Sequence, residues 1–264
     1  MLVVITESYE ALSAKAAQIV ANHLSKNPDL VLGLATGNTP LGLYKELIRL
    51  HKEEGLDFSQ VTTFNLDEYL GLPPTHPQSF YFYIHKNFLN HVNMDPKNVH
   101  VPDGSIRQDF EQYCEHYEQL IRNAGGIDLQ ILGIGKTGHI GFNEPTSSLA
   151  SRTRIKTLAE LTLQENQKAF GPNEKVPPCA ITMGIGTILD AKKILLLASG
   201  GSKADAVAKA IEGPITSTIT ASALQMHADV TVVLEEAAAS SLAYKAYYQR
   251  VLEMTVRLTP ERVE

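Results

Sequence analysis

Short apolar runs alternate along the chain with longer stretches of mixed apolar and polar residues. Seven apolar runs predict strands over residues 2–5, 30–34, 61–64, 129–134, 180–183, 194–198 and 230–234. The longer stretches predict helices over residues 9–24, 40–54, 79–90, 109–124, 203–211 and 240–256. Most strand runs are continuously apolar, which is typical of strands covered on both faces. The pattern therefore predicts an α/β fold: a three-layer, doubly wound, Rossmann-like domain with a mostly parallel sheet.

One polar segment interrupts the alternation of strands and helices. Residues 145–178 contain no strand run, and Ser, Thr, Lys, Arg and paired prolines dominate there. A long polar insert in a compact domain is often functional or mobile. We interpret residues 146–178 as a lid segment beside an active site; a solvated surface excursion is the alternative.

Composition limits the classes of function. The 264 residues include 44% hydrophobic and 20% charged ones, enough for one domain spanning residues 1–264. A net charge of −6 argues against a nucleic-acid partner. The apolar runs are far shorter than the ~20 residues that span a bilayer, and the start lacks a basic signal region. Cys114 and Cys179 have no spacing typical of a disulfide framework, which fits a reducing cytosol. Together these features predict a cytoplasmic protein that binds neither membrane nor nucleic acid.

Two glycine turns follow predicted strands and open helices. Residues 35–40 (ATGNTP) end with Thr39 as a helix cap and Pro40 at the first helical position. Free N–H groups and the helix dipole favour an anion at such a turn. Residues 199–203 (SGGSK) repeat the arrangement with a lysine. Together the turns favour a phosphate-bearing ligand over glycine turns that serve the backbone alone.

A pair of adjacent carboxylates, Asp67 and Glu68, follows the third predicted strand. Adjacent side chains in extended backbone point to opposite sides, so we expect one of them to face the ligand cleft. A carboxylate there can act as a general acid or base. The alternative is that both acids cap a helix.

The densest group of glycines and polar residues is residues 133–145 (GIGKTGHIGFNEP). It fits G-x-G-x-x-G literally, but no helix start or later acidic residue follows as a dinucleotide site requires. Gly135, Lys136 and Thr137 resemble the end of a Walker A loop, but the first glycine of that motif would fall at Gln130, so this interpretation also fails. What remains is His139 between glycines, with Glu144 five residues on. A neutral imidazole near pH 7 can carry protons, and a carboxylate can orient it.

Two other kinds of site are not supported by the sequence. The remaining histidines form no H-x-x-x-H or His/Cys cluster, so we expect no metal site. The nucleophile elbow G-x-S-x-G of α/β-hydrolases is also missing.

Several blocks resemble the glucosamine-6-phosphate deaminases, also called isomerases. The matching blocks are residues 33–40 (GLATGNTP), 63–73 (TFNLDEYLGLP), 133–145 (GIGKTGHIGFNEP) and 148–154 (SLASRTR). They occur in order and extend over nearly the whole chain, and FNLDEY and GHIGFNEP are highly specific.

The resemblance implies an enzyme of amino-sugar breakdown that hydrolytically deaminates glucosamine 6-phosphate to fructose 6-phosphate and ammonia, without metal or organic cofactor. It implies that Asp67 moves the proton from C2 to C1 through an enolamine. His139 would move the proton that opens the sugar ring, and Glu144 would tune the imidazole. The expected substrate-binding residues are Thr36, Gly37, Asn38, Thr39, Gly135, Lys168 and Lys203.

Two positions depart from the family pattern. Thr137 stands where an acidic or amide residue often helps to fix the loop histidine, and a hydroxyl cannot supply a carboxylate's charge. Lys168 stands where some members have a lid arginine, so the bidentate grip on phosphate is lost. Ser147, Arg154, Lys156 and Thr157 match the place where some oligomeric members bind a regulatory N-acetylated sugar phosphate.

The same residues bear on three other functions. A 6-phosphogluconolactonase would share the scaffold, but the NEP ending at residues 143–145 resembles the deaminases. A galactosamine 6-phosphate deaminase differs only in the epimer of its substrate. A non-catalytic sugar-phosphate sensor is disfavoured because Asp67 and His139 are present and no DNA-binding helices are appended. The sequence leaves self-association, regulation and epimer preference undetermined.

Overall fold

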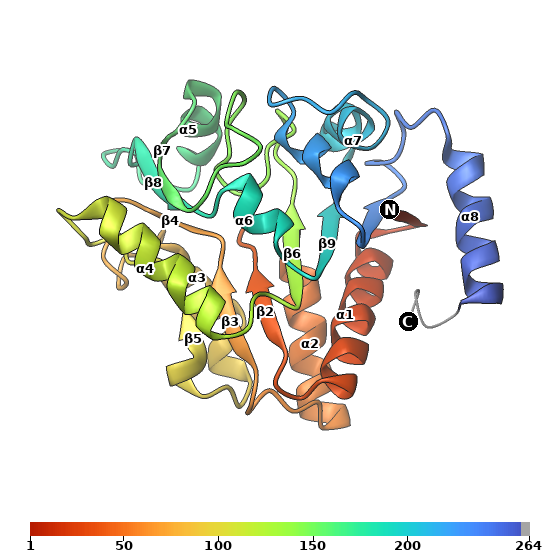
Figure 1. Ribbon diagram of the computed structural model, residues 1–264, viewed down its shortest axis with the longest axis horizontal. Helices are drawn as coiled ribbons and strands as arrows, with labels where there is room; N and C mark the ends of the chain where they lie inside the picture. Colours follow the sequence, from red (N-terminus) through yellow and green to blue (C-terminus); the bar gives the residue numbers. More distant parts are fainter. Residues whose placement is uncertain (260–264) are drawn as a thin grey trace.

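A computed structural model describes residues 1–259 (Figure 1). The end of the predicted domain, residues 260–264, lies outside the described residues. The α-helices are α1 (Tyr9–Lys26), α2 (Leu41–Glu54), α3 (Phe80–Asn87), α4 (Phe110–Asn123), α5 (Glu160–Asn166), α6 (Ile185–Leu189), α7 (Ala204–Ile211) and α8 (Lys245–Leu258). The 3₁₀ helices are η1 (Leu89–His91), η2 (Pro96–Asn98), η3 (Gly201–Lys203) and η4 (Thr220–Met226). The strands are β1 (Leu2–Thr6), β2 (Val31–Leu34), β3 (Thr62–Asn65), β4 (Asp67–Tyr69), β5 (Val99–His100), β6 (Leu129–Gly133), β7 (Arg154–Thr157), β8 (Cys179–Thr182), β9 (Lys193–Ala198) and β10 (Val230–Glu235).

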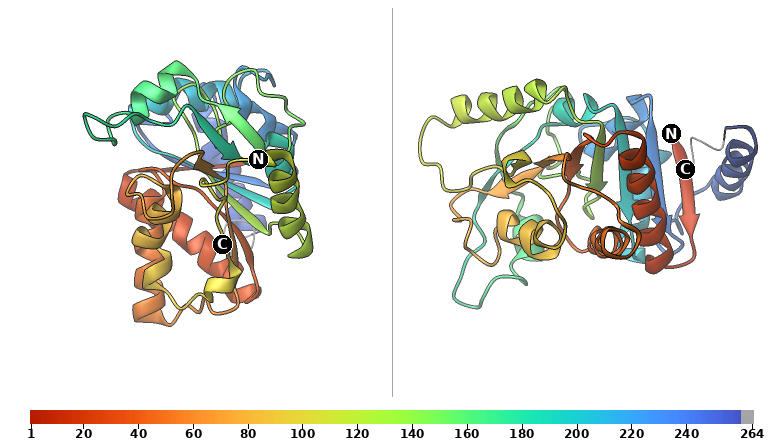
Figure 2. Two further views of the ribbon diagram at one scale, coloured as in Figure 1. Left: turned by 90° about the vertical axis from the view of Figure 1, so that its left-hand side faces the viewer. Right: turned by 90° about the horizontal axis from the view of Figure 1, so that it is seen from below.

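Seven strands form one parallel sheet in the order β1-β10-β9-β6-β2-β3-β5. Helices α1, α2 and α3 cover one face and α4 covers the other, which gives three layers (Figure 2). The predicted doubly wound α/β class with a mostly parallel sheet is confirmed. The strand order reverses where β6 lies beside β2, and ligands of such sheets bind at the carboxyl ends of strands around that point.

A second, antiparallel sheet has the order β4-β8-β7 and lies beyond the carboxyl ends of the large sheet (Figure 1). The prediction that residues 145–178 contain no strand is therefore wrong, because β7 lies within them. Its sequence, RIKT, has one large apolar residue, and all four of its residues are at least partly exposed. An edge strand of this kind gives no apolar run in the sequence. The segment also contains α5, which the sequence did not predict.

The start of α2 differs from the predicted cap. The helix begins at Leu41, one residue after Pro40, and Thr39 makes no side-chain cap. The Tyr9 hydroxyl of α1 accepts the Gly42 N–H at 2.7 Å and lies within hydrogen-bond distance of the Asn38 and Thr39 carbonyls. A side chain far away in the sequence thus replaces the local cap.

The core lies between the large sheet and its helices. In β9 and β10 the central residues, such as Leu196 and Val232, are almost completely buried, as expected for strands covered on both faces. Within residues 1–259, no helix has the length and apolar character needed to cross a bilayer.

Candidate active site

The adjacent acids at positions 67 and 68 have different surroundings. Glu68 is buried and accepts hydrogen bonds from the N–H groups of Phe80 and Tyr81, both at 2.9 Å, so it caps α3. Asp67 is also buried, opposite Thr182 of β8. Gly141 lies against it: a Cβ at Gly141 would lie 3.4 Å from Asp67 Oδ2. Glu68 is therefore the helix-capping acid, and Asp67 faces the loop that follows β6.

The environment of Asp67 disfavours its charged form. Burial raises the pKa of the Asp67 carboxyl to about 8, and the nearby Glu68 contributes in the same direction. The Phe142 N–H acts in the opposite direction. Burial also raises the pKa of Glu68 to about 7, although three backbone N–H groups favour its ionised form. A carboxyl whose pKa lies near neutrality can both take and return a proton.

The loop after β6 holds His139 by its own backbone. The Gly135 N–H donates to the His139 carbonyl at 2.8 Å, so the loop folds back on itself. A Cβ at Gly135 would lie 2.2 Å from His139 Nε2, which only glycine avoids. At Gly138 the backbone φ is +79°, which favours glycine again. The glycines of this loop therefore serve the position of the imidazole.

Two oxygen atoms face His139 Nδ1. Thr137 Oγ1 lies 2.7 Å from Nδ1, and Glu144 Oε2 lies 3.5 Å from it. Glu144 is buried, its Oε1 accepts the Ala159 N–H, and its Oε2 has no hydrogen-bond partner among the described residues. Burial lowers the pKa of His139 while Glu144 raises it, and the net direction is downward. The imidazole is thus held neutral near pH 7, with Nε2 on the Gly135 side.

Asn143 fixes the far end of this loop. Its side-chain amide donates to the carbonyls of Ile140 and Met183 at 2.9 and 2.8 Å, and its Oδ1 accepts from Arg154 at 2.7 Å. Asn143 is completely buried, so these bonds are shielded from water. Sequence reasoning missed Asn143; its only signal is its place in the GFNEP block.

The turn after β2 offers backbone donors. Gly37 and Asn38 are exposed, and Thr36 and Thr39 are half-buried. The N–H groups of Gly37, Asn38 and Thr39 donate to no acceptor in the part of the chain that the structure describes. Gly37 has φ of +100°, and its carbonyl accepts from the Tyr83 hydroxyl, which fixes the turn. Three free donors ahead of α2 suit an anion.

The second glycine turn is held by an acid from β10. The Glu235 carboxylate accepts from the Ser199 hydroxyl at 2.6 Å and from the Gly200 N–H at 2.8 Å. Lys203 is partly buried at the end of this turn, and burial lowers its pKa. It lies close enough to His139 to lower the pKa of the imidazole as well.

The two lysines predicted to bind phosphate are not equivalent. Lys203 interacts with Glu165 and Lys136, and Lys136 Nζ makes an ion pair with Glu165 Oε1 at 2.8 Å. Lys168 is exposed in the turn after α5 and contacts no acidic partner within residues 1–259. The structure thus brings Lys203, but not Lys168, to the histidine. Sequence reasoning missed Lys136 and Glu165; the only signal for Lys136 is its place in the GIGKTGHIGFNEP block.

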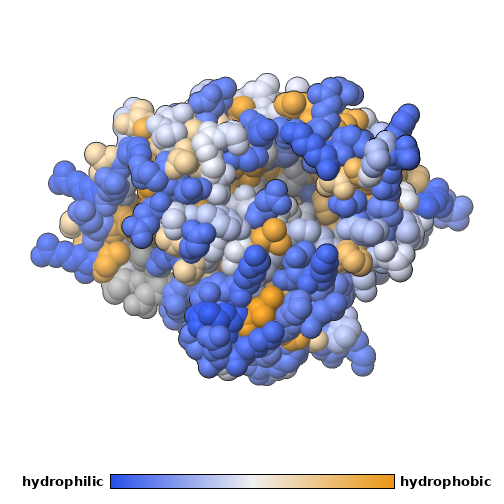
Figure 3. Space-filling view, turned by 180° about the vertical axis from the view of Figure 1, so that it is seen from behind, coloured by the Kyte–Doolittle hydropathy of each residue, from blue (hydrophilic) through white to orange (hydrophobic). Residues whose placement is uncertain are grey.

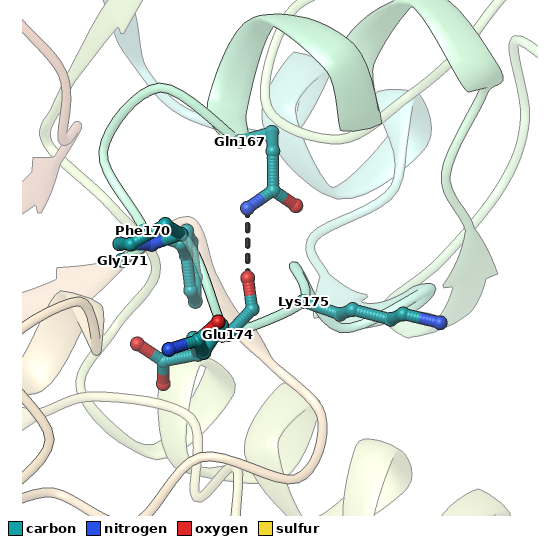
Figure 4. Close-up of a pocket in the computed structure, with 7 residues that line it drawn as sticks. Gln167, Phe170, Gly171, Glu174 and Lys175 are labelled. Atoms are coloured by element: carbon teal, nitrogen blue, oxygen red, sulfur yellow. Dashed lines mark hydrogen bonds between the residues drawn. The ribbon is translucent and has the colours of Figure 1, made fainter.

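The lid segment, residues 146–178, makes its own contacts with the rest of the chain. His76 Nε2 lies 2.5 Å from Glu174 Oε1, and the His76 ring stacks on Phe170. Phe170 and Glu174 also line a hollow of about 450 Å³, at which the Gln167 side chain donates to the Glu174 carbonyl (Figure 4). None of the site residues predicted from the sequence lines this hollow.

The structure brings most of the predicted residues to one edge of the sheet. Their turns follow β2, β3, β6 and β9, which are neighbours in the large sheet. The loop after β6 links Asp67 and His139, because it carries His139 and places Gly141 against Asp67. No group of three or more His, Cys, Asp or Glu side chains within residues 1–259 could hold a metal ion.

Comparisons with known proteins agree with this geometry. The model of the family "Glucosamine-6-phosphate isomerases/6-phosphogluconolactonase" matches residues 5–233. Glucosamine-6-phosphate deaminase of Thermoanaerobacter pseudethanolicus is 52% identical over 240 residues, covering 91% of this chain and 94% of that protein. The Clostridium botulinum enzyme of the same name is 51% identical over 245 residues, covering 93% and 100%.

Solved structures of proteins from both groups in this family description are similar to the chain. A structure described as a monomeric glucosamine-6-phosphate deaminase has a TM-score of 0.89 at 50% identity, covering 91% of this chain and 100% of that one. The 6-phosphogluconolactonase of Trypanosoma brucei has a TM-score of 0.70 at 19% identity, covering 92% and 98%. At that identity the likeness concerns the fold alone.

Proposed function

The chain belongs to the family of glucosamine-6-phosphate isomerases and 6-phosphogluconolactonases, and we propose that it converts glucosamine 6-phosphate to fructose 6-phosphate and ammonia. The observation that carries this assignment is that the loop after β6 holds His139 against Gly135 and lies against Asp67 through Gly141. Aldose–ketose conversion needs two proton carriers close together, one at the ring oxygen and one at C1 and C2. Relatives about 50% identical over 94% and 100% of their length are named glucosamine-6-phosphate deaminase.

His139 performs the first step, the opening of the pyranose ring. Its lowered pKa leaves an imidazole that accepts the proton of the sugar's O1 hydroxyl and delivers a proton to the ring oxygen. Thr137 and Glu144 face Nδ1, so the transfer uses Nε2. Gly135 contributes by leaving space for the ring.

Asp67 performs the second step, the transfer of a proton between carbons. The ionised carboxylate removes the C2 proton to give an enolamine and returns a proton to C1. This leaves an imine at C2, which water hydrolyses to the ketone and ammonia. The substrate's own C2 ammonium favours the ionised carboxylate on binding, because an opposite charge lowers a carboxyl pKa. The raised pKa of free Asp67 thus supports an amino sugar as substrate.

The two glycine turns anchor the 6-phosphate. The free N–H groups of Gly37, Asn38 and Thr39, together with Thr36 and Lys203, form the binding site, and binding energy there positions C1 and C2. Lys168 lies too exposed to take part unless the lid segment moves inward. We further propose one cytoplasmic catalytic domain over residues 1–264, with residues 146–178 as its lid, acting on a sugar phosphate in amino-sugar breakdown.

The direct test is product analysis with the purified protein. Glucosamine 6-phosphate should yield ammonia and fructose 6-phosphate in equal amounts, and product formed in D₂O should carry deuterium at C1. 6-Phosphogluconolactone should open no faster than without protein. Galactosamine 6-phosphate, assayed in parallel, determines the epimer preference. Lactone opening without ammonia release would replace this assignment by the lactonase, and binding without turnover would replace it by a sensor.

A further inference from the structure

Helix α8 lies at the margin of the molecule beside the edge strand β1 (Figures 1 and 2). Two of its side chains, Tyr248 and Leu252, pack against the core, but no residue of α8 is buried. In the view from behind, small orange areas at the left edge, over α8, lie among polar side chains (Figure 3). The helix therefore leaves apolar surface uncovered.

Most of the exposed apolar side chains here follow a heptad spacing. The residues are Tyr244, just before α8, Tyr247, the half-buried Val251, Met254 and Leu258, spaced by three, four, three and four residues; the exposed Val256 lies outside this spacing. That spacing is the a/d pattern by which one helix packs along another. The exposed fractions are 61% for Tyr244, 63% for Tyr247, 43% for Met254 and 68% for Leu258. We call these five residues the α8 stripe.

The helix is held firmly at its start. The Glu212 carboxylate, at the end of α7, accepts the N–H groups of Ala243 and Tyr244, both at 2.9 Å. Lys245 makes an ion pair with Glu236 in the turn after β10. Because these contacts fix the direction of α8, the α8 stripe is a preformed surface whose use costs little ordering.

We propose that the α8 stripe is the contact surface for a second copy of this chain. A heptad seam fits a like seam, so one stripe can pair with itself across a two-fold axis. With aromatic side chains of roughly 150–250 Å² each, the stripe exposes on the order of 450 Å² per copy. Pairing removes about twice that area, and flanking Arg stems bring it to the ~1,000 Å² that a specific interface needs.

The relatives support a second copy as the occupant. α8 lies beyond residues 5–233, which the family model matches. The 50%-identical structure described as monomeric leaves 9% of this chain unmatched, about 24 of the 264 residues. That length is close to the segment from α8 to the end of the chain. The surface thus lies outside the part of the chain that the family model matches, and self-pairing accounts for it without any further protein.

Sedimentation velocity of the purified full chain, from about 1 μM to about 200 μM, tests the proposal. We expect the mass to rise from one chain to two, as for an interface of the smallest specific size. Tyr247→Glu and Met254→Glu should each raise the dissociation constant at least about 100-fold, because pairing would bury an unpaired charge. Gln249→Glu, which adds the same charge at an exposed position outside the stripe, should leave it unchanged.

Melting curves and salt dependence complete the test of self-pairing. Melting temperatures of all variants verify the fold, and Leu258→Lys at the end of the helix replaces any variant that unfolds. A pair held by apolar contact should persist in 0.5 M NaCl, whereas one held by exposed ion pairs should weaken. One-chain mass over the whole range, or a two-chain mass unaffected by Met254→Glu, would overturn the proposal.

Discussion

Replacement of Gly135 by alanine is the sharpest test of the His139 geometry. The added methyl group would lie 2.2 Å from His139 Nε2 and 2.3 Å from its Cε1. Carbon atoms are not found closer than about 3.0 Å, so the imidazole must shift by about 1 Å. A displacement of that size at a catalytic group can cost about 100-fold in rate.

Gly133→Ala is the matched control. Gly133 ends β6, two residues before Gly135, and a Cβ there meets no atom within 4 Å. We expect kcat/KM for ammonia release to fall about 100-fold in Gly135→Ala and less than about threefold in Gly133→Ala. Both variants should lose no more than about 1–3 kcal/mol of stability, as is usual for overpacking.

The assay is ammonia release at several substrate concentrations, with a melting curve for each variant. Equal activity of the two variants, both folded, would show that the imidazole need not occupy the position seen beside Gly135. It would refute the role of His139 in ring opening as derived from this geometry.

Three further changes test other parts of the site. Asp67→Asn should lower kcat by more than about 1,000-fold while sugar-phosphate binding persists. The melting temperature of Asp67→Asn should also exceed that of the original protein, and by more at pH 8 than at pH 5. Burial raises the pKa of Asp67 from 3.8 to about 8. Between these pH values Asp67 ionises in the unfolded chain but keeps its proton in the folded one, so the stability of the original protein falls as pH rises. Thr137→Asp should raise the pKa of His139 and move the acid limb of the pH–kcat/KM profile upward by about one unit; an unchanged limb would make the hydroxyl incidental. Lys203→Ala should raise KM at least about tenfold, whereas Lys168→Ala should change it less than about threefold; the reverse order would assign the phosphate contact to the lid segment.

Long apolar runs made the large sheet predictable. The strands that became β9 and β10 are covered on both faces, so burial alone determines their composition. The elements that sequence reasoning missed are short: β7 has four residues, all at least partly exposed, and α6 has five residues, three of them buried. Their formation depends on partners distant in sequence: β7 pairs with β8, and β8 was expected in the parallel sheet. Local pattern carries no information about such pairing.

The site likewise contains residues that the sequence indicated and contacts that it could not predict. Strand ends and glycine turns indicated where Asp67 and His139 would lie, because parallel strands share one carboxyl edge. The family resemblance stated their roles, and the family match confirms the resemblance itself. The contacts of Asn143, Lys136 and Glu165 could not be predicted, since each joins segments whose distance only the folded chain determines.

The junction of the two sheets has a mechanical consequence. Leu66 alone separates β3 of the large sheet from β4 of the small one, and Asp67 is the first residue of β4. If the small sheet rocks on the large one, displacement grows with distance from this pivot. The carboxylate at the pivot would hardly move, while the lid segment with α5 and Lys168 would move together with the small sheet. Substrate entry and a stationary base are thereby compatible within one rigid-body motion.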